Sequence, residues 1–278
     1  MYDFDYRRPK DLSEAGTLSR RDDFKVLAGG MSLIPVLKMR LARYAGIVDL
    51  GALDALKGIR RDGDAIAIGA MTPHAEVAAS EEVARAIPGL HQLASGIGDP
   101  LVRNRGTLGG SIANADPAAD YPAGLVGLGA TVVTDRRAIA ADDFFTGLFQ
   151  TALEPGEIVR EVRFPVPQAS AYSKLKQPAS RFALVGVFVA RTSTGVRVAV
   201  TGAGPSVFRF EAAEAALGKS FDPAALEGLA LDAAGLNTDI HATAEYRAHA
   251  VKVLTARTVV KCHCEERSWR SNPETLDK

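Results

Sequence analysis

The sequence predicts an α+β protein with two domains and a short C-terminal extension of a different character. Three observations predict this fold class. Residues 1–168 mix short apolar runs with amphipathic segments, residues 169–261 open with strand-like segments, and alanine-rich helical segments close them. A run of strands followed by helices is typical of an α+β domain. We therefore expect one domain over residues 1–168, a smaller one over residues 169–261, and an atypical, disordered extension over residues 262–278.

The first domain alternates short strands with helices. Residues 24–30 form an apolar run that ends in two glycines, and residues 32–42 carry apolar side chains at near-helical spacing. The alanine-rich residues 74–98 predict one or two helices, interrupted near Pro88. Further strands are predicted at residues 45–51, 64–73, 125–135 and 157–167.

The second domain begins after a linker. Prolines and small residues occupy residues 165–171, between two regions of different pattern. Strands are predicted at residues 172–177, 182–191 and 195–204, and helices from Glu211 to about Leu254.

Composition excludes several classes of partner. Lys plus Arg and Asp plus Glu both number 33, so the net charge is zero and no bulk electrostatic attraction favours nucleic acid or an anionic membrane. No apolar run reaches the roughly 18 residues that span a bilayer, and residues 1–10 lack the apolar segment of a secretory signal. We expect a cytoplasmic protein without a membrane span or a nucleic-acid partner.

The cysteines restrict the redox chemistry of the chain. The sequence contains two, Cys262 and Cys264, and none precedes them. Because an iron–sulfur cluster normally takes four cysteine ligands, any cluster must belong to a partner chain. We also expect no metal site in this chain.

A first glycine-rich segment lies between the apolar run at residues 24–27 and the helical pattern that follows. Its sequence is Ala-Gly-Gly-Met-Ser-Leu, residues 28–33. Successive glycines let backbone N–H groups approach a phosphate, and the Ser32 hydroxyl can donate to a phosphate oxygen. A plain turn between strand and helix is the alternative, since the segment is neither G-x-G-x-x-G nor a P-loop.

A second glycine-rich segment covers residues 103–120, with the sequence RNRGTLGGSIANADPAAD. It combines arginines, glycines, hydroxyls, amides and carboxylates in one stretch. Segments of this richness are more often binding loops than spacers, and we expect residues 103–122 to be too polar and turn-prone for the core. A solvated surface loop is the alternative.

Together the two segments resemble the FAD-binding medium subunits of molybdenum hydroxylases, the family of carbon monoxide dehydrogenase and xanthine dehydrogenase. The resemblance rests on AGGMSLIP at residues 28–35, RNRGTLGGS at residues 103–111 and DPAAD at residues 116–120, and it covers residues 1 to about 260. It implies a two-part FAD-binding domain of the vanillyl-alcohol-oxidase-like (PCMH) type, followed by a smaller domain with an antiparallel sheet and helices.

The resemblance also implies which residues contact FAD. The first segment would wrap the pyrophosphate through its backbone, although Met31 replaces a residue that is often polar in the family. Asp120 would accept hydrogen bonds from sugar hydroxyls, as a carboxylate can. The residues implied as cofactor contacts are Ala28, Gly29, Gly30, Met31, Ser32, Leu33, Ile97, Thr107, Gly110, Ser111, Asn114, Asp120, Ile158 and Lys176.

At three of these positions, a role in the core or on the surface is as good an interpretation as a flavin contact. Ile97 and Ile158 match apolar positions near the flavin ring but are also typical core residues. Lys176 matches a lysine close to the isoalloxazine, where a positive charge would favour the anionic reduced flavin, but a surface lysine is the alternative. Arg103 and Arg105 have two alternatives: anchoring the loop or facing a partner subunit.

The resemblance implies an electron relay without a catalytic residue in this chain. A molybdenum-cofactor large subunit would hydroxylate the substrate, a small subunit with [2Fe-2S] clusters would pass electrons on, and FAD in this chain would collect them. A dimer of such heterotrimers is expected. The alternatives are a stand-alone FAD oxidase, against which the short second domain argues, and a flavin-free assembly subunit.

Overall fold

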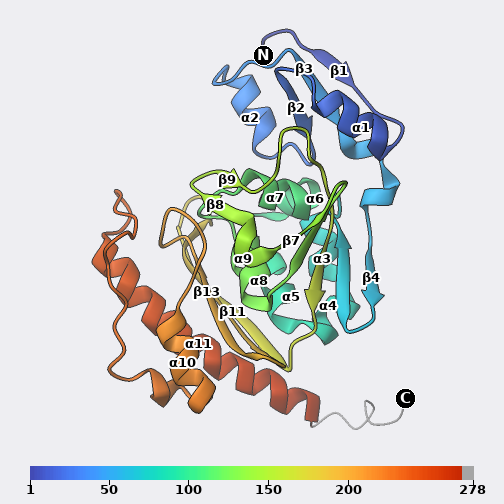
Figure 1. Cartoon of the computed structure of the whole chain (residues 1–278). Helices are drawn as coiled ribbons and strands as arrows, with labels where there is room; N and C mark the ends of the chain where they lie inside the picture. Colours follow the sequence, from blue (N-terminus) through green and yellow to red (C-terminus); the bar gives the residue numbers. More distant parts are fainter. Residues whose placement is uncertain (271–278) are drawn as a thin grey trace.

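The computed structural model describes residues 1–270, with side chains described as far as Cys264. Strands and helices are mixed in the first 168 residues, and an antiparallel sheet with helices follows (Figure 1). The predicted α+β class is confirmed.

A small parallel sheet forms the first part of the chain and lies at one end of the molecule (Figure 1). Its strands are ordered β1-β3-β2, and both outer strands run parallel to β3. The core of this part includes Ala15, Leu18 and Val48, together with Ile158 from much later in the chain. Its elements are β1 Asp5–Arg7, α1 Leu12–Ser19, β2 Phe24–Leu27, α2 Leu33–Lys38, β3 Gly46–Asp49, η1 Leu50–Ala52 and η2 Asp54–Leu56.

The second part of the first domain is a five-stranded antiparallel sheet with helices packed on it. The strand order is β4-β5-β10-β6-β7, so the late strand β10 is central. The strands are β4 Ile59–Asp62, β5 Ala65–Gly69, β6 Thr131–Thr134, β7 Ala138–Ala140 and β10 Val159–Pro165, with the small pair β8 Phe145–Gly147 and β9 Gln150–Thr151. The helices are α3 His74–Ala79, α4 Glu81–Ala86, α5 Pro88–Ser95, α6 Pro100–Arg105, α7 Leu108–Asn114, α8 Tyr121–Leu128 and α9 Ala141–Phe144.

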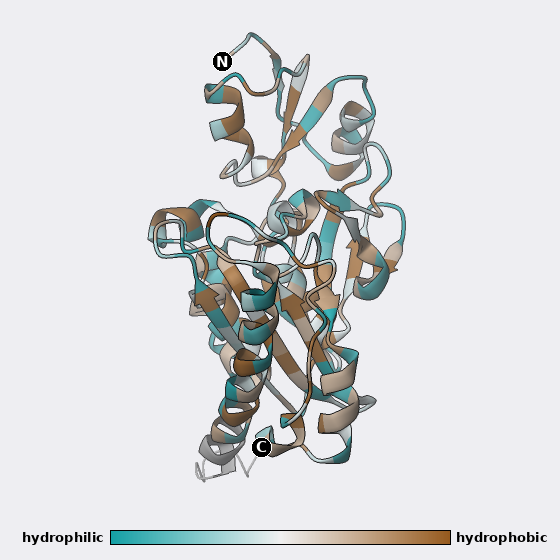
Figure 2. Ribbon diagram, turned by 90° about the vertical axis from the view of Figure 1, so that its left-hand side faces the viewer, coloured by the Kyte–Doolittle hydropathy of each residue, from teal (hydrophilic) through white to brown (hydrophobic). Residues whose placement is uncertain are grey.

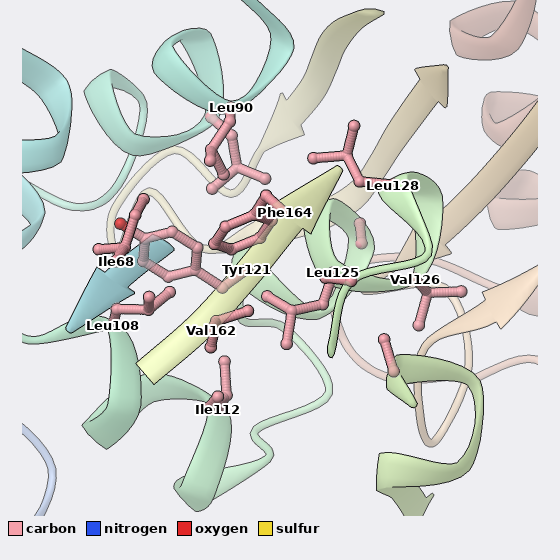
Figure 3. Packing of buried hydrophobic residues seen from close by; sticks show 14 of the residues in the cluster. Ile68, Leu90, Leu108, Ile112, Tyr121, Leu125, Val126, Leu128, Val162 and Phe164 are labelled. Atoms are coloured by element: carbon pink, nitrogen blue, oxygen red, sulfur yellow. The ribbon is translucent and has the colours of Figure 1, made fainter. Parts of the chain in front are cut away.

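Two expectations for this region are wrong. Residues 103–122 are mainly helical, and Leu108, Ile112 and Tyr121 point into the core beside β10 (Figure 3). Residues 125–128, expected to begin a strand, instead end α8. Every residue of α8 is buried, so the segment lacks the amphipathic period that marks a helix in sequence.

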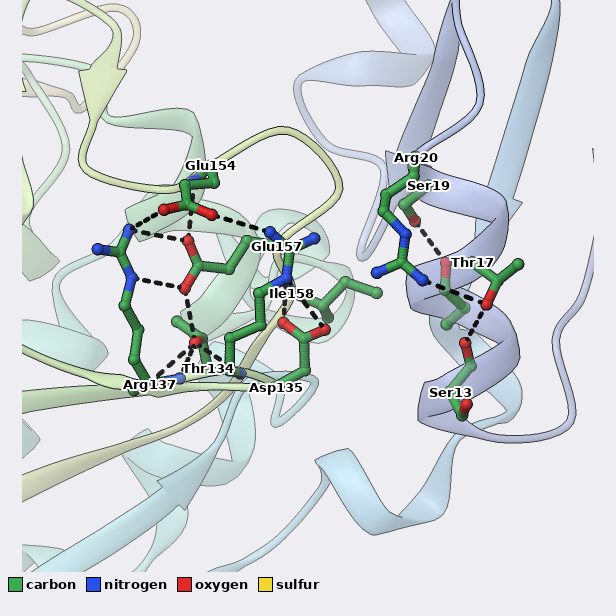
Figure 4. A network of polar contacts seen from close by, with 12 residues as sticks. Ser13, Thr17, Ser19, Arg20, Thr134, Asp135, Arg137, Glu154, Glu157 and Ile158 are labelled. Carbon is green, nitrogen blue, oxygen red and sulfur yellow. Dashed lines mark hydrogen bonds and ion pairs between the residues drawn. The ribbon is translucent and has the colours of Figure 1, made fainter.

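A polar network beside the five-stranded sheet holds the loop at Ile158, whose side chain packs in the core of the parallel-sheet part (Figure 4). The Asp135 carboxylate accepts a hydrogen bond from the Ile158 N–H at 2.8 Å, which anchors the loop that carries Ile158 into the first core.

Glu157, the residue before Ile158, is buried. Burial acts to raise the pKa of Glu157, but hydrogen bonds from Arg137, the Glu154 N–H and Thr134 outweigh it and lower this pKa to about 2.

The C-terminal domain is a four-stranded antiparallel sheet covered on both faces. Helices α10 and α11 pack on one face, and α5 and α8 of the first domain pack on the other. The side chains alternate accordingly: Val187 belongs to the core under α11, whereas Tyr172 and Phe188 belong to the core of the first domain. In Figure 2, hydrophilic and hydrophobic stretches alternate along the outer helices. The elements are β11 Ala169–Lys176, β12 Ala183–Thr192, β13 Gly195–Thr201, β14 Phe208–Arg209, α10 Glu211–Lys219, η3 Pro223–Leu226 and α11 Ala244–Arg270.

The structure differs from the expected extension at residue 262. Helix α11 runs on through Arg270, and Cys262 is fully buried in the core that this helix shares with the sheet. His263 contacts the Phe221 carbonyl through Nε2 at 2.8 Å. The two cysteines therefore continue the last helix, and Cys262 belongs to its buried face whereas Cys264 is exposed. Residues 271–278 lie outside the described residues.

Candidate functional site

The first glycine-rich segment connects β2 to α2 at the edge of the parallel sheet (Figure 1). Gly30 has a φ of +78°, a conformation that favours glycine. Among the described residues, the backbone N–H groups of Gly29, Gly30, Met31 and Ser32 make no hydrogen bond to the protein, and Met31 and Ser32 are exposed. The segment therefore presents unpaired backbone donors, as a phosphate-binding loop does.

The two glycine-rich segments lie against each other. A Cβ atom added at Gly29 would stand 1.9 Å from the Arg105 carbonyl oxygen, so only glycine permits this approach. On the other side, a Cβ added at Gly110 would stand 3.2 Å from the Ala28 Cβ and 2.8 Å from the Thr107 Oγ1. The two glycine-rich segments are therefore in direct contact, and their joint role as one binding site stays a prediction.

Backbone hydrogen bonds to the residues that follow β5 hold the second glycine-rich segment in place. The Leu108 N–H donates to the Thr72 carbonyl at 3.1 Å, and the Gly109 N–H donates to the Ala70 carbonyl at 2.7 Å. Gly109 must lack a side chain here, since a Cβ would come within 2.5 Å of the Ala70 Cβ. These bonds hold the start of α7 rigidly on the central sheet.

His74 lies beneath the same segment. Its backbone N–H donates to the Gly106 carbonyl at 2.9 Å, and its ring is tilted against Tyr121 with centroids 5.2 Å apart. Burial, and secondarily the charge of Arg103, lowers the pKa of His74 to about 4, so the ring is neutral at physiological pH. This histidine supports the loop, in agreement with a structural role.

The predicted contacts on α7 share one face of the helix. Thr107 is the N-cap and accepts from the Gly110 N–H at 3.2 Å, while Ser111 and Asn114 follow at helical spacing. Gly110 places this face toward Ala28. The side chains of Ser111 and Asn114 make no hydrogen bond among the described residues, so a hydroxyl and an amide remain open there.

Asp120, the last of the predicted contacts in the second glycine-rich segment, is buried. Its side chain is 5 % exposed, and its two oxygens accept from the Tyr172 hydroxyl at 2.5 Å and from the Lys174 ammonium at 2.8 Å. Lys174, itself 4 % exposed, also donates to the Gly96 carbonyl at 3.2 Å. Burial raises the pKa of Asp120, and the Lys174 charge and both hydrogen bonds oppose that rise. An ammonium has three donors, so one N–H of Lys174 is not used by these two bonds.

Tyr172 and Lys174 hold the Asp120 carboxylate, and the sequence analysis predicted a role for neither. The signal was available in the alternation of β11, because residues 172, 174 and 176 are spaced by two. A β-bulge between Leu175 and Lys176 interrupts that alternation, and Lys176 is exposed at the strand end. Its charge nevertheless acts on Asp120, so it lies in the same neighbourhood.

The two isoleucines predicted to contact the flavin, Ile97 and Ile158, pack in different cores. Ile158 is 3 % exposed and packs in the core of the parallel-sheet part. Ile97 is partly buried and packs against the main core, directly before the loop that leads into α6. A flavin contact for either residue remains a prediction.

Arg103 and Arg105 occupy different environments. Arg103 donates to the Ile97 carbonyl at 2.9 Å and so anchors the segment, whereas Arg105 is exposed. Among the side chains that the structure describes, as far as Cys264, no cluster of His, Cys, Asp and Glu could hold a metal ion. No helix in the described part of the chain has the length and apolar character needed to cross a membrane.

Comparison with protein families defines the class of this chain. Residues 2–167 match the FAD-binding domain of molybdopterin dehydrogenases, and residues 170–262 match the C-terminal domain of carbon monoxide dehydrogenase flavoproteins. The chain belongs to this family of FAD-binding subunits of molybdenum hydroxylases, and the predicted family and cofactor are confirmed.

Its relatives include medium chains or subunits of dehydrogenases and of a hydroxylase. The chain is 37% identical to the carbon monoxide dehydrogenase medium chain of Hydrogenophaga pseudoflava over 82% of its length and 84% of that protein. It is 36% identical to the nicotine 6-hydroxylase medium subunit of Paenarthrobacter nicotinovorans, covering 92% and 96%. Among solved structures, it superposes on carbon monoxide dehydrogenase from Hydrogenophaga pseudoflava with a TM-score of 0.86 at 36% identity, covering 94% of this chain and 97% of that one.

Proposed function

We propose that this chain binds FAD where the two glycine-rich segments meet, and that it relays electrons from [2Fe-2S] clusters of a partner subunit to a terminal acceptor. One observation carries the site: residues 28–32 and 103–111 come from distant parts of the sequence, yet they approach so closely that Gly29 admits no Cβ. The family match to an FAD-binding domain supports the identity of the ligand.

The open donors of the site fit a dinucleotide. The unpaired N–H groups of residues 29–32 suit the pyrophosphate, and the hydroxyls and amide of Thr107, Ser111 and Asn114 suit the phosphates and ribityl chain. Asp120 has oxygen lone pairs beyond those used by Tyr172 and Lys174, and these suit sugar hydroxyls. FAD supplies the electron transfer itself when bound, and the chain holds it and sets its electrostatic surroundings.

The clusters belong to a partner in this proposal. The sequence has two cysteines, and Cys262 is buried in the core, so this chain cannot supply four thiolates to a cluster. A large subunit with the molybdenum cofactor and a small subunit with [2Fe-2S] clusters complete the proposed heterotrimer, which pairs into a dimer in the cytoplasm. The names of relatives as medium chains support such an assembly.

A titration tests the first half of the proposal. FAD added to the purified chain is expected to bind at one site per chain, with quenching of flavin fluorescence. Gly110→Trp should abolish binding, because even a Cβ there meets Thr107 and Ala28. Gly218→Trp is the matched control, since Gly218 is exposed on α10 with open space around it. Equal FAD binding by both variants would place the cofactor elsewhere.

Reduction of the assembled complex tests the relay. Under anaerobic conditions, the substrate of the complex should reduce the clusters and then bleach the visible flavin bands. In a complex built with Gly110→Trp, the clusters should be reduced while no electrons reach the acceptor. Undiminished transfer to the acceptor without bound FAD would contradict the relay.

A further inference from the structure

Three strands of the C-terminal sheet bring Lys174, Gly186 and Thr201 into one row. Lys174 on β11 pairs with Gly186 on β12, and Gly186 pairs with Thr201 on β13. Tyr172 lies two residues before Lys174, so its side chain leaves β11 on the same face. We call these four residues, Tyr172, Lys174, Gly186 and Thr201, the Gly186 platform.

The platform depends on the missing side chain at its centre. A Cβ added at Gly186 would lie 2.3 Å from the Tyr172 hydroxyl oxygen and 2.8 Å from the Thr201 Cγ2. Because Gly186 has no side chain, the Tyr172 hydroxyl can lie directly beside its backbone. Both neighbours are buried, Tyr172 at 4% exposure and Thr201 at 0%.

The platform carries the segment that leads into Asp120. The Thr201 hydroxyl is within hydrogen-bond distance of the Pro117 carbonyl at 3.0 Å and the Ala119 carbonyl at 2.6 Å, and its one hydrogen serves both. The Gly202 N–H donates to the Pro117 carbonyl at 2.8 Å. These bonds hold the backbone of residues 117–119, immediately before Asp120, against the C-terminal sheet.

The same platform holds the Asp120 side chain. Asp120 stands at the start of α8 but makes no capping bond to that helix. Its oxygens turn instead to Tyr172 and Lys174. Backbone and carboxylate of this position are therefore both fixed by residues of the other domain.

We propose that Thr201 and Tyr172 are positioning residues that set the Asp120 carboxylate against the FAD of the site proposed above. Neither residue contacts the cofactor in this proposal. They act through residues 117–120, so the C-terminal sheet determines how tightly the first domain binds its flavin.

Hydrogen exchange and FAD affinity test the positioning by Thr201. Thr201→Val removes the hydroxyl and keeps the shape of the side chain. In the FAD-free full-length chain, amide exchange of the peptide covering residues 115–121 should rise, and the Kd for FAD should rise about tenfold. Thr201→Ser restores the hydroxyl and should return the Kd to within about threefold of the wild type.

A matched control separates positioning from loss of stability. Thr255→Val makes the same change at another fully buried threonine, whose hydroxyl donates to the Val251 carbonyl within α11. It should lower the melting temperature without altering exchange at residues 115–121 or the Kd for FAD. If Thr201→Val behaves in the same way as Thr255→Val, the positioning role is overturned.

Tyr172→Phe provides an independent variant. It retains the ring that packs near Phe188 and removes the hydrogen bond to Asp120. A raised Kd for FAD and an altered visible spectrum of the bound flavin are expected, and an unchanged Kd and spectrum would contradict a role for this hydroxyl. If the folded wild-type chain takes up no FAD, the proposed function fails, while the exchange measurement still decides whether the platform orders residues 115–121.

Discussion

The two halves of the candidate site are built in opposite ways. The glycine-rich half uses backbone groups of residues 28–32 and the start of α7, and its loop residues Met31 and Ser32 are exposed. The carboxylate half uses side chains, and Asp120 and Lys174 are at most 5 % exposed. We therefore expect the first half to be sensitive to volume added at its glycines, and the second half to be sensitive to any change of its charged side chains. Substitutions in the two halves should therefore differ in their effects on FAD affinity, on stability and on the flavin potential.

The largest effect is expected at the contact between the loops. Gly29→Ala places a Cβ within 1.9 Å of the Arg105 carbonyl oxygen, a backbone atom that cannot rotate away. FAD affinity should fall about 100-fold, because overpacking of this kind costs up to roughly 3 kcal/mol. Flavin fluorescence titration measures the loss. Gly218→Ala is the control, because α10 has open space there, and it should leave affinity unchanged. Normal FAD binding by Gly29→Ala would show that the loops need not touch.

The next effect concerns the charge pair in the buried half. Asp120→Asn leaves the Lys174 ammonium buried without its anion, and the free energy of unfolding should fall by about 3 kcal/mol in urea denaturation. Adding Lys174→Met to this variant should recover most of the stability but not the FAD affinity. Stability equal to the wild type in Asp120→Asn would mean that the pair contributes little to folding.

A smaller effect should follow from pH in the glycine-rich half. The pKa of His74 is lowered from 6.5 to about 4, so between these values the unfolded chain binds more protons than the folded chain. This histidine therefore costs no stability above pH 6.5, and the free energy of unfolding should decline as the pH falls from about 6.5 toward 4. In His74→Gln the decline should be shallower by roughly 2 kcal/mol over that interval. Identical slopes in both proteins would assign the acid sensitivity to other groups.

The smallest effect distinguishes the two lysines of β11. Lys174→Met removes a buried charge and should lower the flavin midpoint potential by about 20 mV, or roughly 1 kcal/mol for a two-electron couple. Lys176→Met removes an exposed, screened charge, and the shift should stay below about 10 mV. Redox titration of the FAD-loaded chain compares them. A larger shift from Lys176→Met would place that side chain nearer the flavin, as the family resemblance implies.

The comparison of the two halves also explains what the sequence predicts. Each segment of the glycine-rich half is local in sequence: Ala28–Ser32 and residues 103–111 are short motifs, and their combination carries the resemblance. The carboxylate half joins Asp120 to β11 and β13, and no short pattern contains such a contact. Lys176 was predicted from the family resemblance, whereas Lys174, two residues earlier on β11, was not predicted. A β-bulge between Leu175 and Lys176 separates the two lysines in the structure.

The errors in the fold have similar causes. Leu125–Leu128 predict a strand because α8 is buried on every side and has no polar face. Residues 103–122 contain many glycines, yet Gly109 and Gly110 serve close packing of α7 and not flexibility. Cys262 and its neighbours lack an apolar period in sequence, but the helix before them carries them into the core.

The Gly186 platform has a consequence for how such subunits can be recombined. A chimaera that exchanges residues 1–168 between relatives would transfer both glycine motifs and Asp120, while the strands that hold this carboxylate would stay behind in the donor. A junction in the linker therefore preserves each folded domain, but it separates Asp120 from the strands that hold its carboxylate. Exchanging β11–β13 together with the first domain would keep each carboxylate with the strands that hold it.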